Sequence, residues 1–184
     1  ILLKESKVSR FFFGGTKVVA FDFCDTLAYQ HPKSEAILRK YLKEILGKNI
    51  SKPQVAAVLG ETIYNYQYSS VNIRDQKARR DFYFEFNKRV LKNLGYDDID
   101  PMDMYKYFSN QNRHWLLKTG VKKLLKVLKE QNFFLLIASN FDSNLNSLLI
   151  NLGVIDFFDR IFVSAELNLE KPHIRFYEHI RDTV

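Results

Sequence analysis

Three apolar runs constrain the fold of this chain more than any other feature. Residues 17–23 read KVVAFDF, residues 133–139 read FFLLIAS and residues 160–165 read RIFVSA. Continuous apolar runs of this length are typical of strands buried on both faces of a parallel sheet. Apolar residues at helical spacing flank the second run, over 121–128 and 145–152. The pattern therefore predicts an α/β fold with a Rossmann-like parallel sheet of three strands.

The long segment between the first two runs contains helical patterns only. Four helices are predicted there from amphipathic spacing and capping signals, at 37–46, after Ser51, over about 75–94 and after Asp100. The sequence thus predicts an all-helical insertion, residues 33–112. It is inserted into an α/β core formed by residues 1–32 and 113–184.

The composition excludes several classes of protein. With one cysteine, Cys24, the chain has neither a disulfide framework nor a multi-cysteine zinc site, which favours a reducing, cytoplasmic location. Its longest apolar run, 133–138, is far shorter than the roughly 18 residues of a membrane span, so no membrane partner is expected. The net charge of +7 is spread out: residues 33–112 hold 14 basic and 10 acidic side chains, and the remainder holds 14 and 11. This spread disfavours a nucleic-acid partner.

Polar side chains follow each of the three predicted strands. Asp22 lies at the end of the first, Ser139 and Asn140 at the end of the second, and Lys171 in a loop after the third. Ligands of open parallel sheets bind at the carboxyl ends of the strands, where these groups would meet. A carboxylate can act as a nucleophile, a hydroxyl can hold an oxyanion, and an ammonium can neutralise charge. Each residue alone could be a cap or a loop residue, but their order and placement together predict a catalytic site.

At these positions the sequence resembles the haloacid dehalogenase-like hydrolase superfamily. The first motif of that superfamily, an apolar strand ending in DxDxT, is matched by VVAFDFCDTL. The second, a strand ending in Ser or Thr, is matched by LLIASN, and the third, a lysine in a KPxPxxF context, by KPHIRF. The resemblance covers residues 17–29 and about 118–177, and the predicted helices lie where many members carry a helical cap. It implies a hydrolase acting on a small, most simply phosphorylated, substrate.

The resemblance also implies roles for individual residues. Asp22 corresponds to the nucleophile, which forms an aspartyl-phosphate intermediate in most members. Ser139 and Lys171 would bind and neutralise the transferring phosphoryl group. Thr26 resembles the threonine that orients the loop after the first strand, and Asn140 would lie beside the substrate.

Cys24 departs from the motif, because phosphatases of the superfamily carry an aspartate there that protonates the leaving oxygen. A thiol with a pKa of about 8.5 is a poor acid for this step. The backbone carbonyl of Cys24 could still bind Mg²⁺ together with the Asp22 carboxylate, because this ligand does not depend on the side chain. The residue predicts impaired phosphomonoester hydrolysis. It leaves open two alternatives, a catalytically weak or inactive binding or regulatory module and a metal-independent, dehalogenase-type hydrolase.

The fourth strand of the superfamily, which ends in acidic metal ligands, has no counterpart in the sequence. Residues 174–184 read as the helix that leads to it. The resemblance therefore predicts an incomplete metal site and an open edge on the first strand. A further segment of a longer chain or a partner chain would cover that edge.

Overall fold

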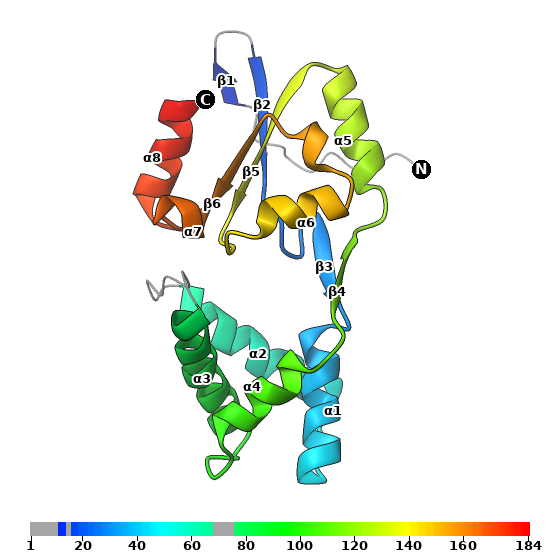
Figure 1. The fold of residues 1–184 in the computed structure, drawn as a ribbon, viewed down its shortest axis with the longest axis vertical. Helices are drawn as coiled ribbons and strands as arrows, with labels where there is room; N and C mark the ends of the chain where they lie inside the picture. The colour runs from blue at the N-terminus through cyan, green and yellow to red at the C-terminus, as the bar shows by residue number, and fades with distance from the viewer. Residues whose placement is uncertain (1–10, 14–15, 68–75) are drawn as a thin grey trace.

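The computed structural model describes residues 11–13, 16–67 and 76–184. The elements form two groups, drawn in the upper and lower halves of Figure 1. A sheet with helices packed on it forms one group, helices α1–α4 form the other, and two short strands connect them. Among the described residues, no helix combines the length and the apolar character needed to cross a membrane.

The main sheet has the strand order β1-β2-β5-β6. Its parallel strands are β2 (Thr16–Phe21), β5 (Phe133–Ser139) and β6 (Arg160–Val163). β5 lies between the other two, and its residues Leu135, Leu136 and Ile137 are almost completely buried. The predicted α/β fold with three parallel strands is confirmed. The first and third strands end two residues earlier than predicted, so that Asp22 lies just beyond β2.

Strand β1 (Phe11–Phe13) pairs in antiparallel orientation with the outer edge of β2. Its three residues are opposite Thr16–Val18. The prediction of an open edge on the first strand is therefore wrong for the first half of β2. On that side of Val19–Phe21, no strand from the described part of the chain is paired.

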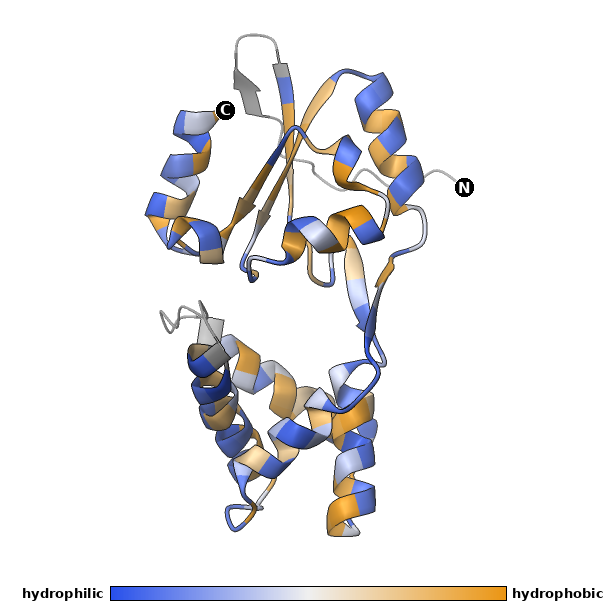
Figure 2. Ribbon diagram, in the orientation of Figure 1, coloured by the Kyte–Doolittle hydropathy of each residue, from blue (hydrophilic) through white to orange (hydrophobic). Residues whose placement is uncertain are grey.

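Helices cover both faces of the sheet. Alternate side chains of β5 point to opposite sides, so apolar side chains on each face are buried by helices. The helices are α5 (Val121–Glu130), α6 (Leu145–Asn151) and α8 (Ile174–Thr183); the short η1 (Ile155–Phe157) and α7 (Ser164–Leu167) flank β6. Leu135 and Ile137 belong to a buried cluster with α5 and α6, whereas Leu136 and Ala138 belong to a second cluster with Phe176 of α8. In Figure 2 orange residues predominate on β5 and β6, and α5 and α8 carry both orange and blue residues.

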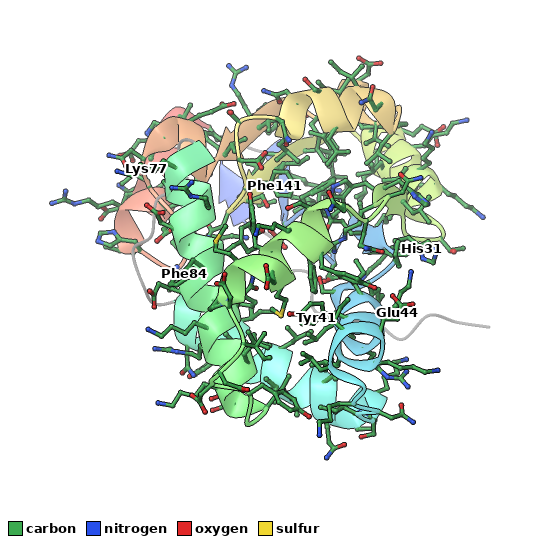
Figure 3. All side chains as sticks on the ribbon, turned by 60° about the horizontal axis from the view of Figure 1, so that its bottom comes forward. His31, Tyr41, Glu44, Lys77, Phe84 and Phe141 are labelled. Atoms are coloured by element: carbon green, nitrogen blue, oxygen red, sulfur yellow. The ribbon has the colours of Figure 1, made fainter. Side chains whose placement is uncertain are left out.

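Helices α1–α4 enclose a hydrophobic core of their own. They span Ser34–Leu46, Lys52–Gln67, Gln76–Asn93 and Pro101–Ser109; the predicted start of the third helix, at 75, lies outside the described residues. Their shared core consists of Leu38, Tyr41, Leu42, Val55, Leu59, Val90, Leu91 and Met104. Figure 3 brings this helical insert forward, with Tyr41 and Glu44 of α1 labelled.

Two helix starts have the predicted caps. The Asp100 carboxylate accepts a hydrogen bond of 2.9 Å from the N–H of Met102. At the start of α2, Gln54 Oε1 accepts a hydrogen bond of 3.2 Å from the N–H of Ser51 and one of 2.6 Å from the Ser51 hydroxyl. These contacts satisfy polar groups at the helix starts, which explains why the sequence signals located them correctly.

An antiparallel ribbon of two strands carries the chain into the helical insert and back. It consists of β3 (Ala28–His31) and β4 (His114–Leu117). The ring of Trp115 on β4 packs against Phe23 and Phe141, with centroid distances of 5.1 and 5.5 Å. The ribbon is thereby fixed to the end of the main sheet at which Asp22 lies.

Asp159, just before β6, ties its loop to β5. One carboxylate oxygen accepts a hydrogen bond of 2.7 Å from the N–H of Leu135, and both oxygens lie 2.8 Å from the Lys129 ammonium. Partial burial acts to raise the pKa of the Asp159 carboxyl, but the hydrogen bonds from Lys129 and Leu135 outweigh it and the pKa is lowered. A carboxylate whose folded pKa lies below its unfolded value stabilises the fold at neutral pH. That contribution is lost as the pH falls below about 4.

The substitution Asp159→Asn is expected to lower the free energy of unfolding at pH 7 by about 1–3 kcal/mol, because Leu135 and Lys129 lose a charged partner. Urea unfolding followed by circular dichroism measures the change. The difference from the unaltered chain should shrink at about pH 3. Asp156→Asn, at an exposed position of η1, is the matched control. Equal losses in the two variants, or a loss at Asp159 that does not depend on pH, would contradict this role.

Candidate functional site

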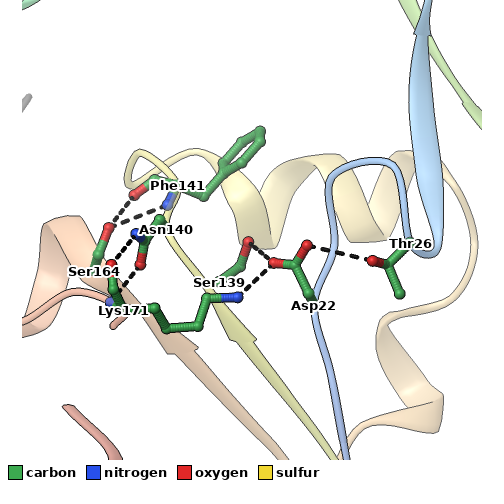
Figure 4. Close-up of polar contacts among 7 residues, drawn as sticks. All are labelled: Asp22, Thr26, Ser139, Asn140, Phe141, Ser164 and Lys171. Atoms are coloured by element: carbon green, nitrogen blue, oxygen red, sulfur yellow. Dashed lines mark hydrogen bonds and ion pairs between the residues drawn. The ribbon is translucent and has the colours of Figure 1, made fainter. Parts of the chain in front are cut away.

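Three predicted side chains meet at the carboxyl end of the parallel strands (Figure 4). Asp22 follows β2 and Ser139 ends β5, so the pairing of these strands places the two residues next to each other. The Ser139 hydroxyl donates a hydrogen bond of 3.0 Å to Asp22 Oδ1, and the Lys171 ammonium donates one of 2.8 Å to the same oxygen. Lys171 is 149 positions from Asp22 in the sequence, so only the fold brings the two charges together.

The Asp22 carboxylate and the Lys171 ammonium are partly open to solvent. The exposed fractions of their side chains are 36% and 25%, whereas Ser139 is completely buried. A small substrate can therefore approach the carboxylate without any rearrangement of the sheet. The adjacent ammonium is placed to neutralise negative charge on such a substrate. Because solvent screens an ion pair of this exposure, the pair contributes more to the chemistry of the site than to the stability of the fold.

The loop after Asp22 turns back toward β3 and holds Thr26 beside the carboxylate. The carbonyl of the buried Phe23 accepts a hydrogen bond of 3.1 Å from the N–H of Ala28. Asp25 has a φ of 54°, in the left-handed region that Asp and Asn tolerate better than most residues. The Thr26 hydroxyl donates to Asp22 Oδ2 over 3.4 Å, a long hydrogen bond. The proximity supports an orienting role for Thr26, which stays a prediction.

Lys171 lies outside the helices and strands and is held in place by Asn140. The side chain of Asn140 donates a hydrogen bond of 2.8 Å to the Lys171 carbonyl and accepts one of 2.8 Å from the Lys171 N–H. We call this pair of contacts the Asn140 clamp. The amide oxygen and nitrogen both bind the backbone of Lys171, so Asn140 fixes the backbone from which the ammonium extends to Asp22. A direct contact between Asn140 and substrate stays a prediction.

Ser164 contributes to the site region although it carries no motif in the sequence. Its hydroxyl accepts a hydrogen bond of 3.1 Å from the N–H of Phe141 and donates one of 3.3 Å to the carbonyl of the same residue. It thereby joins the end of β6 to the loop that follows β5 (Figure 4). The signal that could have indicated it is the small polar residue near the end of the third apolar run.

Cys24 lies between two carboxylates in the loop that follows β2, and the residue as a whole is exposed. The surrounding protein nevertheless partly desolvates the thiol. This desolvation, together with the negative charges of Asp25 and Asp22, raises the pKa of Cys24 to about 11. Arg113 and Lys118 act in the opposite direction and do not compensate. The thiol is therefore protonated at neutral pH, and it is an even weaker general acid than an ordinary cysteine.

The raised pKa predicts slow alkylation of Cys24. At pH 8 a thiol with a pKa of about 11 is only about 0.1% thiolate, which is the reactive form. The greater nucleophilicity of a more basic thiolate offsets part of this deficit. Iodoacetamide is expected to modify Cys24 at least about tenfold more slowly than free cysteine, as measured by mass spectrometry over time. The urea-unfolded chain is the control and should react at the rate of free cysteine. Equal rates in the folded and unfolded chain would show that the folded environment does not suppress the thiolate.

The predicted magnesium ligands, Asp22 and the backbone carbonyl of Cys24, supply two kinds of oxygen donor. Mg²⁺ requires an octahedron of oxygen atoms from carboxylates, water and substrate phosphate. Asp22 Oδ1 already accepts two hydrogen bonds, and nowhere in the described part of the chain do three His, Cys, Asp or Glu side chains gather closely enough to hold an ion. These residues alone do not form a magnesium site.

Comparison with known proteins identifies the family. Residues 16–184 match the family model of the haloacid dehalogenase-like hydrolases. The chain belongs to this family. The matched segment contains Asp22, Ser139 and Lys171 and also includes the helical insert. The resemblance inferred from the three motifs is therefore confirmed, and the chain is a haloacid dehalogenase-like hydrolase by family.

Solved structures of the same family share the fold at low sequence identity. The magnesium-bound putative hydrolase YfnB from Bacillus subtilis has a TM-score of 0.59 and 19% identity, and the match covers 92% of this chain and 72% of YfnB. The L-2-haloacid dehalogenase from Xanthobacter autotrophicus, with chloropropionic acid covalently bound, has a TM-score of 0.54 and 18% identity. That match covers 92% of this chain and 65% of the dehalogenase. Among curated protein sequences, none matches this chain.

Proposed function

We propose that the chain is a hydrolase with Asp22 as its nucleophile, most simply a phosphatase that acts on a small phosphorylated metabolite through an aspartyl phosphate. The observation that carries this proposal is the placement of one carboxylate oxygen between two donors, the Lys171 ammonium at 2.8 Å and the Ser139 hydroxyl at 3.0 Å. When a phosphate replaces the carboxylate as their partner, these donors would hold its oxygens beside the attacking Asp22.

The reaction has two steps at Asp22. A carboxylate oxygen attacks phosphorus, the bond from phosphorus to the leaving oxygen breaks, and the electron pair remains on the leaving group. Lys171 and Ser139 hold the equatorial oxygens of the phosphoryl group during this transfer. Water then attacks the phosphorus of the aspartyl phosphate, the bond to the Asp22 oxygen breaks, and inorganic phosphate leaves with the free carboxylate restored.

The environment of Cys24 restricts the leaving groups that this site can expel. An alkoxide needs a proton as it leaves, and a thiol with a pKa of about 11 supplies one poorly. Nitrophenolate and carboxylate leaving groups are stable without that proton. The proposal therefore predicts activity on aryl and acyl phosphates and weak activity on alkyl phosphates such as glycerol 3-phosphate.

A direct test compares the hydrolysis of p-nitrophenyl phosphate, acetyl phosphate and glycerol 3-phosphate, each with Mg²⁺ and with EDTA. Release of phosphate from the first two at least about tenfold faster than from glycerol 3-phosphate supports the proposal. Loss of turnover in EDTA supports the predicted magnesium cofactor. If none of the three is hydrolysed, the chain is not a phosphatase of this kind.

The second candidate is a metal-independent dehalogenase. The same observation on Cys24 favours it, because a halide also leaves without a proton. Asp22 would attack the carbon that carries the halogen, the halide would leave with the electron pair of the broken bond, and water would hydrolyse the resulting ester. The Xanthobacter autotrophicus neighbour with covalently bound chloropropionic acid provides a substrate to try. Release of chloride from 2-chloropropionate in EDTA supports this candidate.

The third candidate, a binding or regulatory module without activity, is supported if both assays are negative while a phosphorylated ligand still binds.

In the two enzymatic candidates the helical insert, with its separate core, acts as the predicted cap domain of residues 33–112. It would close over Asp22 and reduce the access of water to the reacting group.

A further inference from the structure

Arg113 joins the two ends of the helical insert at its connection to the sheet. It directly precedes β4, and its Nη2 donates a hydrogen bond of 3.1 Å to the hydroxyl of Ser34, the first residue of α1. The Nε atom of Arg113 is completely buried and has no hydrogen-bond partner among the residues that the structure describes. A buried, unpaired N–H on a charged group is costly, so most such groups in proteins have a partner.

No carboxylate of the described residues forms an ion pair with Arg113, although the side chain is half-buried. Desolvation lowers the pKa of the guanidinium, and the ionisable groups that oppose this shift are Tyr83 on α3 and Cys24 in the loop after Asp22. An arginine nevertheless remains charged at any physiological pH. The structure therefore contains a permanent positive charge that is partly removed from water.

Partly buried and exposed residues alternate along β4 and the residue before it, Arg113. Arg113, Trp115 and Leu117 are partly buried, whereas His114 and Leu116 between them are exposed. Residues at every second position of an extended segment lie on the same face. The ring of Trp115 on that face packs against Phe23, the residue that follows Asp22. Arg113 lies closer to the helical insert along the chain than Trp115, and its guanidinium is near enough to Cys24, in the loop after Asp22, for the two groups to influence each other electrostatically.

We propose that Arg113 binds a second anionic group of the substrate, a carboxylate or a phosphate remote from the group that reacts at Asp22. A guanidinium forms paired, charge-assisted hydrogen bonds with either anion. The side chain is partly exposed, but its Nε–H is buried, so the side chain would have to turn before this N–H could meet such a group. The inference rests on the proposed function, because Lys171 and Ser139 must hold the reacting group of the same molecule. It narrows the substrate class to molecules with two separated anionic groups.

The test measures binding to the Asp22→Asn chain, which cannot turn over phosphate esters by the proposed route. Isothermal titration calorimetry compares two matched pairs of ligands, 3-phosphoglycerate with glycerol 3-phosphate and fructose 1,6-bisphosphate with fructose 6-phosphate. The first pair differs by a carboxylate and the second by a phosphate. In at least one pair the ligand with two anionic groups is expected to bind at least about tenfold more tightly. The pair that discriminates identifies the anion.

Adding Arg113→Gln should reduce that preference to less than about threefold, because glutamine keeps a donor for Ser34 but carries no charge. Arg39→Gln, at an exposed arginine of α1, is the control and should leave the preference unchanged. Equal binding within both pairs, or a preference that survives Arg113→Gln, overturns the inference while the proposed phosphate site stands. If none of the four ligands binds, the proposed function fails and the inference fails with it.

Discussion

Replacing Asp22 with asparagine is expected to reduce the turnover of p-nitrophenyl phosphate by at least about a thousandfold. The amide that replaces the carboxylate has no nucleophilic oxygen of comparable strength, while Lys171 and Ser139 remain to bind the substrate. The loss should therefore appear in kcat, with a much smaller change in KM. Steady-state kinetics of the variant and the unaltered chain, at the same protein concentration, measures both constants.

Asp25→Asn is the matched control for this prediction. Asp25 lies in the same loop and is exposed, and asparagine also tolerates its φ of 54°. This variant should keep its kcat within about threefold of the unaltered chain. If Asp22→Asn and the unaltered chain turn over the substrate at equal rates, the assignment of Asp22 as the nucleophile is wrong.

Replacing Cys24 with aspartate is expected to raise the rate of hydrolysis of alkyl phosphates by about 10²–10⁴-fold, the usual contribution of a positioned general acid. The negative charges that raise the pKa of the thiol, on Asp25 and Asp22, would also favour the protonated form of a carboxyl at this position. That form can give its proton to an alkoxide, and the resulting carboxylate can then activate water. Phosphate release from glycerol 3-phosphate measures the gain.

Cys24→Asn separates acid catalysis from a change of size or polarity, because its amide has nearly the shape of the carboxyl and no acidic proton. No gain is expected from this variant on any substrate. A gain from aspartate alone indicates a phosphatase scaffold that lacks only its acid. If aspartate gives no gain either, the missing proton is not what limits the site, and the dehalogenase and binding-module candidates become stronger.

The fold was predictable where single segments carry their own signal. The run at 133–139 forms the central strand because apolar residues on both faces can be buried only inside a layered sheet. Asp100 was predictable as a cap because its carboxylate accepts a hydrogen bond from the N–H of Met102, only two residues away. The ribbon of β3 and β4 was not, because four residues of mixed polarity show no clear alternation. Its register depends on a partner strand far away in the sequence.

The candidate site shows the same division. Asp22 and Ser139 were predictable as neighbours because parallel strands end at one edge of a sheet, and the structure joins them through a hydrogen bond of 3.0 Å. The contacts of Asn140 were not predictable, because backbone groups of Lys171 are its partners and backbone groups are the same in every residue. Arg113 was missed for a related reason: its unpaired Nε is visible only once burial is known.

The Asn140 clamp ties the backbone that carries the Lys171 ammonium directly to the end of the central strand. The backbone N–H and carbonyl of Lys171 are both hydrogen-bonded to the side chain of Asn140, which directly follows β5. Changes confined to residues 168–170, between α7 and Lys171, would then leave these two hydrogen bonds available. Buried residues such as Leu149 and Val163 restrict the rest of the chain between Asn140 and Lys171, so sequence variation should be tolerated mainly in its loops, whereas Asn140 should not vary freely.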